Sequence, residues 1–239
     1  MFNLLSRTYA DTHRRIANIH FDTDNFLSKT IIALYASVIE QTGSALTLLK
    51  AGQHVGVNII LRSTLEGYID LINLIADPNY LDQMTASYHK EWIKMLEPGL
   101  NGDQPFLAPY EVDELAESLE HHRNELSILT QRGVKPLQAR SRFEKAQMLS
   151  VYHTVFNALS ADSHNNIRAL MSRHFRIGND GTEVVIFKSL EKEDLAPALF
   201  SFTDIYIRTG ISVHSHFKSN GAEVFRHYAQ QLERLCRSS

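Results

Sequence analysis

The sequence predicts an all-α protein, a single helical bundle over residues 1–239 with one small β-hairpin near residues 174–188. Apolar residues recur every three or four positions through most of the chain, which is the spacing of amphipathic helices. Turn-forming residues divide these stretches, and only one segment has the short, glycine-bounded pattern of a hairpin. Because the helices on either side of the loop at 98–109 are too few to build two cores, we expect one domain.

In the first half of the chain, helices are expected over residues 3–19, 23–50, 54–76, 79–96 and 110–130. Thr23 or Asp24 is the predicted cap of the second helix, because a side-chain oxygen there can accept a backbone N–H bond. The third helix ends before Pro78, which disfavours the helical conformation at the preceding residue. Pro98 ends the fourth helix and opens the 98–109 loop, the one candidate domain boundary. The fifth helix is strongly charged and is expected to be solvated on all sides.

In the second half, helices are expected over residues 142–159 and 165–173. The hairpin follows, with its turn bounded by Gly178 and Gly181 and its second strand running to Phe187. A long helix then opens with acidic residues from Glu191 onward, which the helix macrodipole favours. Asn220 and Gly221 break this helix, and one more helix follows to the end of the chain.

The composition indicates a globular protein, with 44% hydrophobic residues, 21% charged residues and a formal net charge of -3. That charge gives no general support for nucleic-acid binding, although a local basic patch would still allow it. The single cysteine, Cys236, excludes an intramolecular disulfide and a cysteine zinc site. No signal-peptide core follows Met1, and no run of about 18 apolar residues occurs. We therefore expect a cytoplasmic protein that does not bind membranes.

One polar stripe crosses the otherwise apolar helix predicted over residues 54–76. Asn58, Arg62, Glu66 and Asp70 are spaced four apart, so they share one face. A helix this apolar should lie inside the bundle, and buried charges are costly unless they are paired. Arg62 and Glu66 are therefore predicted to contact each other and to be mostly buried. The stripe is either a structural network or a functional site.

A second polar group follows later in the chain, formed by Tyr152, Ser160 and His164. Ser160 and His164 are four residues apart, so they share a face if the helix continues through both. We expect them to face the same interior as Arg62, with His164 within about 6 Å of the stripe, the reach of one bridging water. No nucleophile-elbow motif surrounds Ser160, which argues against a serine hydrolase.

The chain is rich in histidine, with 12 residues, but metal binding is not expected. The paired Glu-x-x-His motifs of a di-iron bundle are missing, as is a glycine-rich phosphate loop, so no cofactor is expected. Arg168 and His174 have the arginine-gap-histidine spacing of HEPN-type ribonucleases. The same spacing occurs at three other places, and Ala169 stands where that motif usually has a polar residue. We expect no RNA cleavage that depends on His174.

Two segments together resemble a known bacterial family. The first reads Ile59-Ile-Leu-Arg62-Ser-Thr-Leu-Glu66-Gly-Tyr-Ile-Asp70, and the second reads Tyr152-x6-Leu159-Ser160-x3-His164. In this order, with a hairpin and a terminal helix after them, they are similar to the domain of unknown function 5677, over about residues 25–215. The resemblance implies an all-helical cytoplasmic protein without an established activity. Carried over to this chain, it points to Arg62, Glu66, Ser160 and His164. That family's likeness to HEPN-like bundles is an analogy of fold, which does not assign a function.

Three functions follow from these patterns. The first is a non-enzymatic binding module with a polar pocket, whose partner is a small anionic ligand or a protein, because an arginine can hold a carboxylate or phosphate with two hydrogen bonds. The second is a HEPN-like, metal-independent ribonuclease acting as a toxin or phage-defence effector. The third is a structural bundle that forms homodimers and uses its polar stripe to fix helix register.

Overall fold

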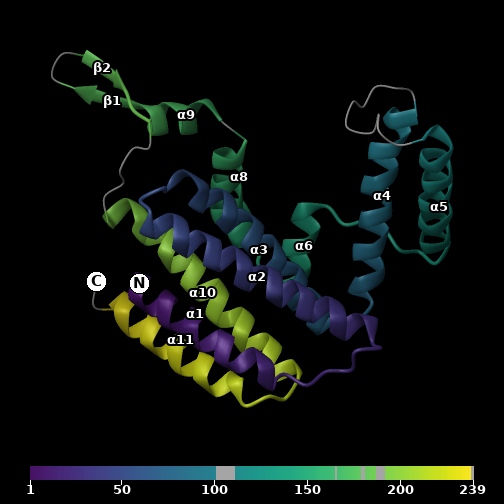
Figure 1. The fold of residues 1–239 in the computed structure, drawn as a ribbon, viewed down its shortest axis with the longest axis horizontal. Helices are drawn as coiled ribbons and strands as arrows, with labels where there is room; N and C mark the ends of the chain where they lie inside the picture. The colour runs from purple at the N-terminus through teal and green to yellow at the C-terminus, as the bar shows by residue number, and fades with distance from the viewer. Residues whose placement is uncertain (101–110, 165, 179–180, 187–191, 238–239) are drawn as a thin grey trace. The chain divides into compact units, whose positions relative to one another are not determined.

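The computed structural model describes residues 1–100, 111–164, 166–178, 181–186 and 192–237. These residues are mostly helical, with a single antiparallel two-stranded sheet among them, so the predicted fold class is confirmed (Figure 1). The chain forms two compact units, Met1–Ala76 with Phe143–Ser239, and Asp77–Arg142. The unit boundaries therefore fall outside the 98–109 segment, of which residues 101–109 lie outside the described residues. The single domain stays a prediction.

The first unit contains the long helices, the short helices near residue 160 and the hairpin. Its helices are α1 (Phe2–Arg15), α2 (Phe26–Lys50), α3 (Val55–Ala76), α7 (Leu149–Val151), α8 (Asn157–Ser163), α9 (Ile167–His174), α10 (Lys192–His216) and α11 (Gly221–Arg237). A 3-10 turn, Ile16–Asn18, follows α1, and a π-helical segment, Tyr152–Phe156, joins α7 to α8. The strands β1 (Phe175–Gly178) and β2 (Gly181–Val184) confirm the predicted hairpin, whose expected last residues, 187–188, lie outside the described ranges.

The core of the first unit is built where α2, α3 and α10 contact one another. Apolar residues of α2 at helical spacing, Ile31, Tyr35 and Val38, are buried in this core. Among the described helices, α2 is also long and apolar enough to cross a bilayer by length and composition. The core helix of a globular protein passes the same test.

Several predicted helix boundaries are corrected. The cap of α2 is Asn25, whose Oδ1 accepts the backbone N–H of Ser28, rather than Thr23 or Asp24. Helix α4 (Tyr80–Leu100) continues through Pro98 for a last turn. Proline removes only one helical hydrogen bond there, and Leu100 packs on a buried apolar cluster.

The predicted helix over residues 142–159 is also broken. Helix α6 (Ala139–Lys145) ends before Gln147, whose φ of 56° lies in the left-handed region and turns the chain. The chain then passes through α7 and the π-helical segment before α8 begins. A π-helical segment shifts the register of the side chains that follow it, which a sequence pattern with a period of 3.6 residues does not reveal.

In the second unit, α4 and α5 (Val112–Gln131) pack on each other. Leu96, Leu115 and Leu119 form a buried cluster, and an ion pair of 2.6 Å joins Arg123 to Glu97. The expectation that α5 is solvated on all sides was wrong, since Leu115, Leu119 and also His122 are buried against α4. Leu115 and Leu119 are four residues apart and form a short apolar stripe. The many charged residues of this helix make that stripe hard to recognise in the sequence.

A pair of buried histidines also links the two helices of this unit. His89 Nδ1 and His122 Nδ1 are 2.8 Å apart, so one ring donates and the other accepts a hydrogen bond. The chain's single tryptophan, Trp92, stacks on the His122 ring, with centroids 5.3 Å apart. Burial lowers the pKa of both histidines; Glu125 opposes this for His89, and His121 adds to it for both.

Acidification is therefore expected to loosen this helix pair. A lowered pKa in the folded state means that the unfolded state binds more protons, so the stabilisation is present above about pH 6.5 and is lost as the pH falls below it. Protonation of both rings also places two N–H donors against each other. The emission of Trp92 should change between pH 7.5 and 5. In the variant His122→Phe, which keeps a ring but does not titrate, the change should be much smaller; an equal change in that variant would contradict the assignment.

Candidate functional site

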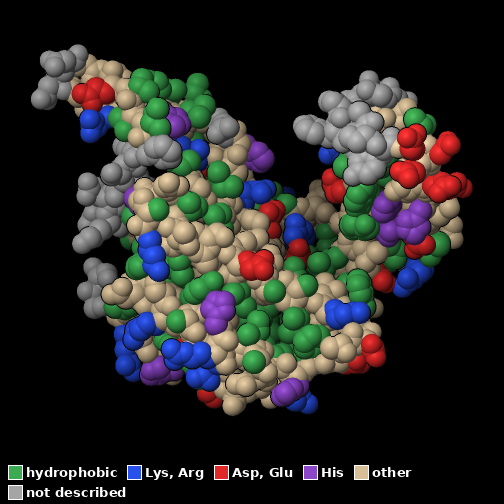
Figure 2. All heavy atoms as spheres, viewed as in Figure 1, with side chains coloured by type: hydrophobic (Ala, Val, Ile, Leu, Met, Phe, Trp, Pro, Cys, Tyr) green, Lys and Arg blue, Asp and Glu red, His purple; other side chains and the backbone are tan. Residues whose placement is uncertain are grey.

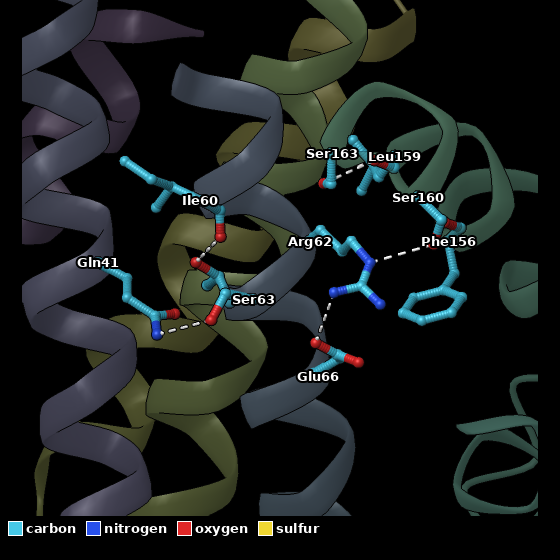
Figure 3. Close-up of polar contacts among 10 residues, drawn as sticks. Gln41, Ile60, Arg62, Ser63, Glu66, Phe156, Leu159, Ser160 and Ser163 are labelled. Atoms are coloured by element: carbon cyan, nitrogen blue, oxygen red, sulfur yellow. Dashed lines mark hydrogen bonds and ion pairs between the residues drawn. The ribbon is translucent and has the colours of Figure 1, made fainter. Parts of the chain in front are cut away.

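The predicted Arg62–Glu66 contact is present on α3, within a wider set of interactions. Arg62 Nη1 lies 3.2 Å from Glu66 Oε2, and Arg62 Nε donates to Ser160 Oγ over 3.1 Å (Figure 3). The guanidinium carbon also lies 4.8 Å from the centroid of the Phe156 ring. The Arg62 and Glu66 side chains are 25% and 24% exposed, so the pair is mostly enclosed but still reaches the surface. These contacts hold α8 and the π-helical segment against α3.

The Ser160 hydroxyl group both donates and accepts a hydrogen bond. Its Oγ accepts from Arg62 and donates to the carbonyl of Phe156 over 2.8 Å. His164 was expected to share its face, but α8 ends at Ser163 and His164 is its exposed C-cap. Among the described residues, the His164 side chain has no hydrogen-bond partner. The structure thus joins Ser160 to the polar stripe, while His164 makes no hydrogen bond to it within the described chain.

Tyr152 and Asp70 lie at the edges of this arrangement. Tyr152 stacks on Phe156, with centroids 5.4 Å apart and an interplanar angle of 20°, and it also contacts the Phe143 ring. Its role in this arrangement is therefore to support the ring beneath Arg62. Asp70 is buried two turns beyond Arg62 on α3.

A second connection lies next to the first, at the N-terminal end of the stripe. Asn58 Nδ2 donates to Asp162 Oδ2 over 2.7 Å. Arg173 of α9 donates to the backbone oxygen of Asp162 over 2.7 Å and lies 3.5 Å from its Oδ1. Asp162 therefore joins three helices: α3, α8 and α9. No sequence pattern pointed to Arg173 or Asp162 as part of this contact.

Two cavities lie on either side of the Asn58–Asp162 contact. The larger, of about 370 Å³, lies among α3, the end of the π-helical segment, α8 and the start of α10. The smaller, of about 140 Å³, is bounded by residues of α3, α8 and α9, with Arg173 in its wall. Asn58 and Asp162 line both cavities. The Asn58–Asp162 contact is thus part of the wall of both cavities, and it places carboxylate and amide atoms at the edge of each cavity.

The lining of the larger cavity is mixed in character. Leu61, Val155, Leu159 and Pro197 supply apolar surface, while Thr154, Ser201 and Asp194 supply polar atoms. No lysine or arginine belongs to this lining within the described chain. A volume of about 300–1,000 Å³ with an apolar lining and a few polar groups is typical of small-molecule sites.

The residues of the ribonuclease alternative are not brought together. Arg168 and His174 are six residues apart on α9, which places them on different faces of a helix with 3.6 residues per turn. Arg168 is exposed, and His174 Nδ1 lies 3.3 Å from the backbone oxygen of Val185. Within the described ranges, no group of three or more histidine, cysteine, aspartate or glutamate side chains is placed to hold a metal ion.

The fold and the site define a mostly helical protein in which two polar contacts join α3 to α8 beside a small cavity. The model of a family of unknown function, DUF5677, matches residues 29–182. The match covers more than half of the chain, so the protein belongs to this family, and it includes every residue of the Arg62 and Asp162 contacts. No curated protein and no solved structure matches the chain.

Proposed function

We propose that the protein is a binding module for a small molecule that occupies the cavity beside Asn58 and Asp162. The observation that carries the proposal is that these two residues, hydrogen-bonded to each other, line both cavities. A wall of this kind presents fixed polar groups to a ligand, and the apolar side chains opposite it supply contact area. The contacts of Arg173 and Arg62 hold this wall in place.

The charges of the site favour a neutral or positively charged ligand over the anionic ligand that the sequence suggested. Arg62 is paired with Glu66 and does not line either cavity, so its charge is not directed at them. The charged residues of the larger cavity are Asp194 and Asp162, of which Asp162 is paired with Arg173 of the smaller cavity. A carboxylate or phosphate placed there would meet like charge, whereas an amine or a hydrogen-bond donor would be attracted.

Binding is better supported than catalysis. Nucleophilic catalysis by a serine needs a base within hydrogen-bond reach of its hydroxyl group. The proton of Ser160 is directed at the Phe156 carbonyl, and His164 is exposed at the end of α8. The ribonuclease alternative needs an arginine and a histidine that converge on one phosphate, which the separation of Arg168 and His174 on α9 does not support.

A fragment screen on the full chain tests the proposed function. The probes are small amines, neutral amides and alcohols, and carboxylates, and binding is read by ligand-observed NMR. Ala158 lines the larger cavity and is itself exposed, so Ala158→Phe should fill the cavity at little cost in stability. Asn157→Phe is the matched control, because Asn157 is the exposed neighbour outside the lining.

Amines and neutral fragments are expected to bind the wild type and the control, and to lose at least about tenfold in affinity, or about 1.4 kcal/mol, in Ala158→Phe. Carboxylates are expected to bind most weakly. Binding that persists unchanged in Ala158→Phe, or a wild type that binds none of the fragments, would contradict the proposal and leave the polar contacts with a structural role alone.

A further inference from the structure

Helix α9 and the hairpin expose an unusual amount of apolar surface. Their large exposed side chains are Ile167 (73%), Met171 (49%), Phe175 (37%), Ile177 (90%), Val184 (72%) and Ile186 (73%). Figure 2 shows hydrophobic side chains gathered over this part of the first unit. Single exposed apolar residues are ordinary, but several of them gathered on two consecutive elements are typical of an interaction surface.

The strand register places the apolar residues of the hairpin on one face. Phe175 pairs with Val184, and Ile177 pairs with Thr182, so these side chains project to the same side. The intervening pair, Arg176 and Glu183, lies on the opposite side and forms an ion pair of 2.6 Å. The hairpin is thus amphipathic, with a charged face and an uncharged apolar face. We call the six side chains listed above the apolar face.

The apolar side of the hairpin favours a further contact. A two-stranded hairpin is marginal unless its apolar side packs on something else. Helix α9 also has exposed apolar side chains on one face, because Ile167 and Met171 are four residues apart and both exposed. In the part of the chain that the structure describes, these side chains remain largely uncovered.

We propose that a second copy of this chain covers the apolar face, in a two-fold symmetric contact of hairpin against hairpin. The six side chains expose on the order of 700 Å² per copy, close to the roughly 800 Å² that each partner buries in a standard interface. The face carries no charged residue, so two copies meet without like-charge repulsion. Self-complementarity is the defining feature of a two-fold interface. This inference is independent of the ligand cavity.

Two other occupants fit less well. A charged partner protein finds no complementary charge on the apolar face, since Arg176 and Glu183 lie on the other side of the hairpin and neutralise each other. A lipid surface finds no net positive charge on the described strands, because Glu183 neutralises Arg176. Membrane-binding segments instead place basic residues and aromatic or aliphatic side chains at the contact.

Sedimentation velocity on the full chain, from about 1 to 200 µM, tests the proposal, because the population of a homodimer depends on concentration. The wild type should shift from monomer to dimer within this range. Ile177→Asp places a charge in the proposed contact and should raise the dissociation constant at least about tenfold, with Val184→Asp acting alike. Arg176→Gln changes the net charge by the same amount on the opposite face and should leave the dissociation constant within about threefold of the wild-type value.

Two results would overturn the proposal. One is a wild type that stays monomeric throughout, and flotation of that monomer with vesicles of phosphatidylcholine and phosphatidylglycerol would point to a lipid surface instead. The other is an Ile177→Asp variant that dimerises like the wild type. Circular dichroism of each variant shows that it is folded. A variant that does not fold is replaced by Thr182→Asp, which alters the same face at an exposed residue.

Discussion

Replacing Phe225 with alanine is expected to reduce the free energy of unfolding of the first unit by about 3–5 kcal/mol. Phe225 is 1% exposed on α11, and its ring reaches α10 where Gly210 leaves room for it. A Cβ at Gly210 would lie 2.5 Å from that ring, so the aromatic side chain fills the space left by the glycine. Truncation of Phe225 leaves a cavity that the packed helices can close only in part.

The matched control is Leu235→Ala, which shortens an apolar side chain that is 39% exposed on the same helix. Its effect should stay below about 1 kcal/mol. Urea unfolding followed by circular dichroism measures both variants. An equal loss in the two, or a loss below about 1 kcal/mol in Phe225→Ala, would show that α11 is not packed on α10 as described.

The second large effect is a loss of stability in acid caused by His214. This residue is fully buried at the end of α10, stacked on Phe225 and hydrogen-bonded through Nδ1 to Ser219 Oγ. Burial, with a smaller contribution from the charge of Arg15, lowers the pKa of His214 to about 4. Its pKa in the unfolded chain is about 6.5. Between about pH 4 and pH 6.5, His214 is therefore protonated in the unfolded state but not in the folded state.

The stabilisation linked to His214 is thus fully present above about pH 6.5 and is lost as the pH falls toward 4, by up to about 3 kcal/mol. Urea unfolding at several pH values from 7.5 to 4.5 measures the slope. His214→Gln should flatten the slope of the free energy of unfolding against pH, whereas the exposed control His227→Gln should leave it as in the wild type. Identical slopes for His214→Gln and the wild type would refute the assignment.

Much of the fold could be predicted because it depends on the spacing of residues that are close together in the sequence. The stripe on α2, the stop before Pro78 and the glycine-bounded hairpin each depend on neighbouring residues, and the structure confirms all three. The Arg62–Glu66 contact belongs to the same class, because residues four apart on one helix must be neighbours.

The remaining features depend on contacts between distant segments. Arg173 lies 11 residues beyond Asp162, and a turn between α8 and α9 brings them together. The burial of His122 is imposed by Trp92 and His89 of α4. A shared face for Ser160 and His164 assumes a helix that continues through both, whereas α8 ends at Ser163, one residue before His164.

The central claim is that the Asn58–Asp162 contact is the wall of a ligand site and not only a connection between helices. The most direct test is an NMR titration of one amine fragment that binds the wild type, repeated with Asp162→Asn. This substitution keeps the size of the side chain but removes its charge. The claim predicts that affinity falls at least about tenfold, while Arg168→Gln, which removes an exposed charge outside both cavities, stays within about threefold of the wild-type dissociation constant. An unchanged dissociation constant in Asp162→Asn would contradict it.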